Sequence, residues 1–85
     1  MFKDVADRLP EFAEYFHVPI GTWGAEQLSS AISYILRWWM PPHYGSFNWH
    51  LQAEIDCLCS GEFRARAFAV GVPDDALDQA RLWYA

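Results

Sequence analysis

The chain has 85 residues, of which 53% are hydrophobic and 18% aromatic, and eleven acidic residues against six basic ones give it a formal net charge of −5. This apolar content excludes a disordered chain, and the length is too small for two separate cores, so we predict a single domain over residues 1–85. The acidic balance argues against a protein that neutralises nucleic-acid phosphates, because such proteins carry a basic patch.

The first predicted element is an amphipathic helix over residues 2–16. Its apolar residues recur at steps of three and four, which places them on one helical face: Phe2, Val5, Leu9, Phe12 and Phe16. Four carboxylates repeat on nearly the opposite face: Asp4, Asp7, Glu11 and Glu14. Pro10 lies inside this pattern and predicts either a kinked helix or a second helix that restarts there, because proline removes a backbone donor.

A loop with Pro19, Gly21 and Gly24 leads to a second predicted helix over residues 24–40. Its apolar residues cover an arc of about 200°, which is wider than the apolar stripe of an ordinary surface helix. We therefore expect this helix to be the central one. Its narrow polar face consists of Ser29, Ser30, Ser33 and Arg37.

The third predicted helix covers residues 46–61. Ser46 is a good N-cap residue and Gly61 a good left-handed terminator. The predicted core stripe consists of Phe47, Leu51, Ile55 and Leu58. Trp49 falls on the far side of that stripe, so we expect it to be exposed.

Residues 62–72 are ambiguous, because they alternate loosely as a strand does but contain three alanines, which favour a helix. Pro73, Asp74 and Asp75 then predict the start of a last helix, which carries Leu77 and Ala80 on one face. The predicted fold class is all-α, a compact bundle of four to five short helices around the helix at 24–40. The alternative is an α+β fold with a strand at 62–72.

The spacing of small and apolar residues around Gly71 resembles that of a helix-turn-helix unit. Three carboxylates, however, occupy the start of the last helix, where such a unit makes its phosphate and base contacts: Asp74, Asp75 and Asp78. We therefore expect a helical corner that packs the core. A small nucleic-acid-associated regulator with a degenerate helix-turn-helix-like C-terminal half is the alternative function.

The four carboxylates of the first helix span about 15 Å. Spaced negative charge on a rigid helix can imitate a phosphate backbone and occupy a basic groove that binds nucleic acid. The simpler interpretation is a solvated face, which Lys3 and Arg8 dilute.

Five aromatic residues crowd around the turn after the second helix: Trp38, Trp39, Tyr44, Phe47 and Trp49. One small core cannot hold all of them, so we expect Trp49, Tyr44 and Trp38 to be exposed. Exposed Trp and Tyr side chains are typical anchors of protein interfaces. Plain core packing is the alternative.

We expect neither a metal site nor catalysis. His43 and His50 lie near Cys57 and Cys59, but cysteines two residues apart diverge on a helix and cannot bind one zinc ion together. No phosphate-binding loop, nucleophile elbow or metalloprotease motif occurs, and each histidine lacks an evident partner. The protein is therefore predicted to be no enzyme and to need no cofactor.

The sequence thus predicts a non-enzymatic acidic protein-interaction module. We expect an inhibitor or adaptor that occupies a surface of a larger partner, of the kind that phages and mobile elements use against host machinery. The predicted partner-binding residues are Asp4, Asp7, Glu11, Glu14, Trp38, Tyr44 and Trp49. The expected partner is a basic nucleic-acid-handling protein rather than nucleic acid or a membrane, and a homodimer is a third alternative. Two cysteines and the lack of an apolar signal region favour the cytoplasm.

Overall fold

The computed structural model describes residues 2–38 and 47–83, and all regular structure within these residues is helical. Five α-helices and one 3-10 turn follow each other: α1 (Phe2–Phe16), η1 (Ile20–Thr22), α2 (Ala25–Trp38), α3 (Phe47–Cys59), α4 (Gly61–Ala69) and α5 (Asp74–Leu82). The all-α prediction is therefore confirmed. The segment 62–72, for which a strand was the alternative, forms most of α4 and the turn that follows it.

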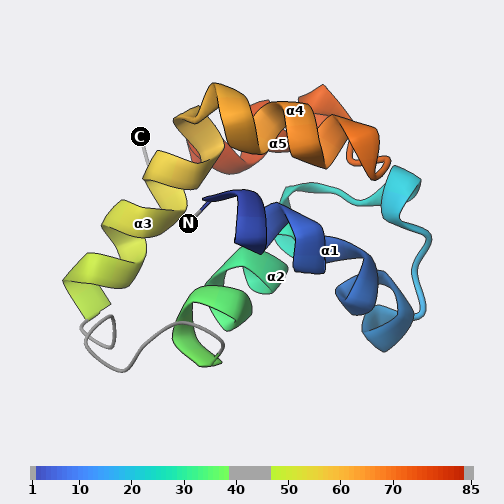
Figure 1. Cartoon of the computed structure of the whole chain (residues 1–85), viewed down its shortest axis with the longest axis horizontal. Helices are drawn as coiled ribbons and strands as arrows, with labels where there is room; N and C mark the ends of the chain where they lie inside the picture. Colours follow the sequence, from blue (N-terminus) through green and yellow to red (C-terminus); the bar gives the residue numbers. More distant parts are fainter. Residues whose placement is uncertain (1, 39–46, 84–85) are drawn as a thin grey trace.

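The helices pack around one buried core. α2 contacts α1, α3 and α5, and α4 packs on α1 and on both of its neighbours in the chain. Figure 1 shows α1 and α2 together in the middle of the molecule, with α3 at one side and α4 and α5 above them. Six of the fourteen residues of α2 are buried, in agreement with the wide apolar arc predicted for it.

α1 is one helix that continues through Pro10, so of the two alternatives the second helix that restarts at this residue is excluded. Pro10 is exposed, whereas Val5, Leu9 and Phe12 are buried as the periodicity predicted. The apolar face thus holds the helix against the core on both sides of the missing backbone donor. His17 ends the helix with a φ of 56°, and the Val18 N–H donates to the Ala13 carbonyl at 3.2 Å, which is the pattern of a left-handed helix terminus.

α3 faces the core with a different side from the one predicted. Its buried residues are Ala53, Glu54, Cys57 and Leu58, whereas Leu51 and Ile55 are only half-buried. On a helical projection the observed buried face is rotated by about 85° from the predicted stripe. Leu58 is buried as predicted, and the side chain of Phe47 lies outside the described part of the structure. The prediction was wrong for Leu51 and Ile55 because it ranked residues by hydrophobicity, whereas the small side chains of Ala53 and Cys57 let α3 pack against its neighbouring helices.

Gly61 was predicted to terminate α3, but it is the first residue of α4. The Ser60 hydroxyl accepts a hydrogen bond from the Phe63 N–H at 3.3 Å and caps the new helix. Arg64 then joins three elements, since its Nε donates to the Leu58 carbonyl at 2.8 Å and its Nη1 lies 2.9 Å from the Asp78 carboxylate of α5. The N-cap formed by Ser60 therefore makes Gly61 the start of a new helix rather than the end of the previous one.

Gly71 makes the turn between α4 and α5 with a φ of 97°, and a Cβ on it would lie 3.2 Å from Ile20 Cγ2. We expect Gly71→Ala to lower the free energy of unfolding by about 1–2 kcal/mol, because alanine is strained at positive φ. Gly61→Ala is the matched control: nothing lies within 4 Å of its Cβ position, and alanine favours a helix, so its stability should be unchanged or higher. Urea denaturation followed by circular dichroism measures both; equal values for the two variants would contradict this account of the turn.

Candidate functional site

Four aromatic side chains of α1 and α2 form a continuous strip of ring contacts. Along it the ring centroids are 6.3 Å apart between Trp38 and Tyr34, 5.1 Å between Tyr34 and Phe12, and 6.3 Å between Phe12 and Tyr15. Phe12 is 5% exposed, whereas Trp38, Tyr34 and Tyr15 are 67%, 46% and 73% exposed. This aromatic strip therefore has a buried middle ring and three rings that face solvent.

Helix geometry and helix packing together assemble the aromatic strip. Tyr34 and Trp38 are four residues apart on α2, and Phe12 and Tyr15 are three apart on α1, so each pair lies on one face of its helix. The packing of α1 on α2 then brings the two pairs together. Scattered exposed aromatics are ordinary on a protein surface, but a contiguous set of them is typical of an interaction site.

The acidic face predicted for α1 is present: Asp4, Asp7, Glu11 and Glu14 are all exposed. Its two halves differ in their surroundings. Asp7 lies 3.7 Å from the guanidinium of Arg66 on α4, so a cation partly offsets the charge at this end. Glu11 instead lines a hollow together with three rings of the aromatic strip. The aromatic and acidic surfaces therefore meet at the C-terminal half of α1.

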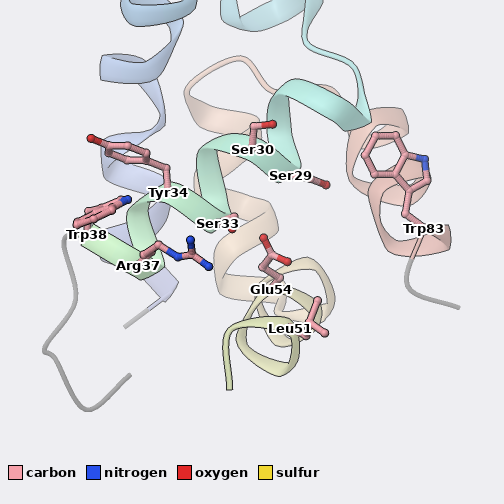
Figure 2. Close-up of a pocket in the computed structure, with 9 residues that line it drawn as sticks. All are labelled: Ser29, Ser30, Ser33, Tyr34, Arg37, Trp38, Leu51, Glu54 and Trp83. Atoms are coloured by element: carbon pink, nitrogen blue, oxygen red, sulfur yellow. The ribbon is translucent and has the colours of Figure 1, made fainter. Parts of the chain in front are cut away.

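Within the described residues, two hollows border the aromatic strip. The small hollow, of about 170 Å³, is lined by Glu11, Phe12, Tyr15 and Tyr34. The groove, of about 470 Å³, lies between α2, α3 and the end of α5 (Figure 2), and is lined by Ser29, Ser30, Ser33, Tyr34, Arg37, Trp38, Leu51, Glu54 and Trp83. Tyr34 lines both, so its ring lies between the two.

The groove is polar on one side and aromatic at its edges. In Figure 2 the side chains of Arg37 and Glu54 point into the space between α2 and α3, and Trp83 stands at the opposite end from Trp38. Glu54 is only 5% exposed, and the Ser29 hydroxyl oxygen is buried with no hydrogen-bond partner among the described residues. The polar face predicted for α2 thus lines one side of an open groove, with Ser30 and Arg37 exposed.

Of the three aromatic residues that were predicted to be exposed, Trp38 and Trp49 differ in exposure. Trp38 is exposed, as predicted. Trp49 is not: it is half-buried and packs against the core, because the observed rotation of α3 reduces its angle from the buried face from about 165° to about 110°. Tyr44 lies outside the described residues. Tyr15 and Tyr34, which the sequence reasoning missed, take the place of Trp49 in the exposed set.

Cys57 and Cys59 point apart, as their spacing predicted, since Cys57 is buried and Cys59 is exposed. Burial raises the pKa of the Cys57 thiol to about 12, and the neighbouring carboxylates of Asp56 and Glu54 add to the shift. No group of three or more His, Cys, Asp and Glu residues within the described part of the chain is placed to hold a metal ion. In the same residues, every helix is too short or too polar to cross a membrane.

We expect Cys57 to lower the stability of the protein at alkaline pH. In the unfolded chain its thiol ionises around 9.0, whereas the folded state keeps it protonated to about 12, so the unfolded state loses its proton first. The protonated Cys57 thiol therefore contributes to the free energy of unfolding in full below about pH 9, and this contribution is lost as the pH rises toward about 12. The free energy of unfolding, measured in urea from about pH 8 to 10.5, should fall less in Cys57→Ala than in the wild type or in Cys59→Ala. Equal slopes in all three would contradict the buried thiol.

The α4–α5 corner packs as the helix-turn-helix spacing suggested, with Ala67, Val72, Leu77 and Ala80 buried. The exposed start of α5, however, carries Asp74, Asp75 and Asp78, and Arg64 is already paired with two of these carboxylates, at 4.0 Å and 2.9 Å. This surface would repel phosphates.

No protein-family model, curated protein or solved structure matches the chain.

Proposed function

We propose that this protein is a non-enzymatic interaction module that binds a larger, basic protein through the aromatic strip and the adjoining carboxylates Glu11 and Glu14. The observation that carries the proposal is that three solvent-facing rings are linked by ring contacts: Trp38 contacts Tyr34 directly, and Tyr34 and Tyr15 both contact the buried ring of Phe12. Tyr and Trp are the residue types that most often dominate the energy of protein interfaces.

The aromatic strip has the layout of an interface in which apolar anchors lie next to a charged rim. Its rings offer large contact areas that lose little side-chain entropy on binding, because each has only two side-chain torsions. The small hollow and the groove share Tyr34 as a lining residue, and both offer places for protruding side chains of a partner. A surface with two hollows gives more shape complementarity than a flat aromatic patch would.

The charge of the surface supports a basic partner. Glu11 and Glu14 are exposed, make no ion pair among the described residues, and belong to a chain with a net charge of −5. Such a surface attracts a basic protein over long distances and repels both nucleic acid and a second copy of this chain. A protein that handles nucleic acid is the basic partner we favour, since its binding groove already accommodates spaced negative charge.

Within this proposal the protein acts as an inhibitor or adaptor in the cytoplasm, where its two free thiols stay reduced. Covering a basic groove would block the nucleic acid that normally occupies it. The use of such proteins by phages and mobile elements against host machinery fits this mode of action, and the affinity capture described next would identify the host target.

Charge reversal tests the proposal. The partner is isolated by affinity capture, and its dissociation constant is measured for Glu11→Lys/Glu14→Lys and for Glu62→Lys/Asp75→Lys, which changes the net charge equally at exposed positions on α4 and α5. We expect the first variant to weaken binding by about tenfold or more and the second by about threefold or less, because only the first places cations at the contact. Equal losses would show non-specific attraction and contradict the proposed surface.

A further inference from the structure

The small hollow combines three aromatic rings with one carboxylate. Phe12 is its buried lining residue, and the Tyr34 and Tyr15 rings stand at 64° and 61° to the Phe12 ring, with centroids 5.1 Å and 6.3 Å away. Glu11 precedes Phe12 on α1 and supplies the one charged lining residue. The two tyrosines and Glu11 are exposed, so a partner can reach all three from solvent.

These groups select for a cation. The faces of aromatic rings carry partial negative charge and attract ammonium or guanidinium groups, and the carboxylate of Glu11 supplies a full countercharge. An anion would be repelled by both, and a purely apolar group would leave the Glu11 carboxylate without an ion pair. The hollow is also smaller than the pockets of about 300 Å³ or more that hold small-molecule ligands, so it has room for one side chain rather than a cofactor.

We propose that the small hollow receives an arginine side chain of the partner protein, with the guanidinium stacked on the tyrosine rings and paired with Glu11. A guanidinium is planar and weakly hydrated, so it stacks on an aromatic face and still presents two parallel N–H donors to a carboxylate at its edge. An ammonium group is a compact, strongly hydrated charge that cannot do both at once. This inference rests on the proposed function, because it names the partner group that one part of the interface recognises.

The test uses N-acetyl-arginine amide as the probe and follows the aromatic proton signals of Phe12, Tyr15 and Tyr34 by NMR. We expect saturable shifts in the millimolar range, with much smaller shifts from the neutral isostere N-acetyl-citrulline amide and weaker binding of N-acetyl-lysine amide. Equal binding of the citrulline compound would overturn the proposal. Tighter binding of tetramethylammonium than of the arginine probe would also overturn it, in favour of a quaternary ammonium site.

Two variants connect the probe to the hollow. Glu11→Gln and Tyr15→Leu should each weaken binding of the arginine probe by about threefold or more, since each removes one of the attractive groups. Asp75→Asn removes one exposed carboxylate elsewhere and should leave the affinity unchanged. Tyr15 is 73% exposed, so the Leu variant is expected to fold normally. Equal affinity of Glu11→Gln, Tyr15→Leu and Asp75→Asn would place the probe elsewhere and overturn the proposal.

The inference and the proposed function fail in different ways. If the wild type ignores the arginine probe but still captures a partner that Glu11→Lys/Glu14→Lys loses, the arginine proposal is wrong and the proposed function stands. If the probe binds in the hollow but Glu11→Lys/Glu14→Lys and Tyr15→Leu both leave the partner bound, the hollow is an arginine site and the proposed function is wrong.

Discussion

Replacing Tyr34 and Trp38 together with alanine is expected to weaken partner binding by about a hundredfold or more, as measured by calorimetry with the captured partner. Tyr34 lines both the small hollow and the groove and Trp38 lines the groove, and the two side chains are 46% and 67% exposed in the free protein. Truncating aromatic anchors at the centre of an interface typically costs about 2 kcal/mol or more each, although such losses are not additive.

Phe68→Ala is the matched control for this double variant. Phe68 is 71% exposed on α4 and lines neither of the two hollows. Its truncation should change partner affinity by about twofold or less, because the exposed aromatic ring that it removes lies away from the contact. A silent double variant together with a damaging Phe68→Ala would move the binding surface to α4.

The largest effect on folding is expected for Phe63→Ala, which should lower the free energy of unfolding by about 3–5 kcal/mol. Phe63 is the largest of the fully buried side chains and lies on the core side of α4. Small domains are stable by only about 5–15 kcal/mol, so this one change should remove much of the folded population.

Phe68→Ala again provides the comparison, since it removes the same ring from the exposed side of the same helix. Its effect on stability should stay within about 0.5 kcal/mol. Urea denaturation of both variants, followed by circular dichroism, measures the difference. Similar midpoints for the two variants would contradict the orientation of α4 that places Phe63 and Ala67 in the core.

The features that were predicted correctly rest on long, regular patterns. The apolar face of α1 recurs over about four turns and its acidic face over about three, which explains why Leu9 is buried and Glu11 exposed in spite of Pro10. The burial of α2 was also predicted correctly, because its apolar arc is so wide that a small error in the predicted rotation of the helix leaves the same residues buried. Patterns of this length average out the contribution of any single residue.

α3 shows where sequence reasoning fails. Its apolar residues do not form a single stripe, and hydrophobicity alone could not show that Ala53 and Cys57 face the neighbouring helices while Leu51 stays half-buried. The same error led to the expectation that Trp49 is exposed, whereas it is half-buried and packs against the core. Helix packing depends on side-chain shape as well as on polarity, and shape complementarity becomes visible only once the neighbouring helices are placed.

The aromatic strip was only partly predictable for a similar reason. The crowding of aromatic residues after the second helix predicted that Trp38 is exposed. The four-residue spacing of Tyr34 and Trp38 also indicates that both lie on one face of a helix. The approach of Phe12 and Tyr15 to Tyr34 depends on how α1 packs on α2, which no local pattern shows. The groove, which is lined by three helices, is equally a product of tertiary structure.

Hydroxyl-radical footprinting of the complex with its captured partner tests the central claim most directly, because it reports which exposed side chains become covered. We predict strong protection of Tyr15, Tyr34 and Trp38, with Phe68 and Leu82 labelled as fast as in the free protein. Both controls are 71% exposed and lie outside the two hollows, so they report on the rest of the surface. Protection of Phe68 and Leu82 with unchanged labelling of Tyr34 and Trp38 would contradict the account.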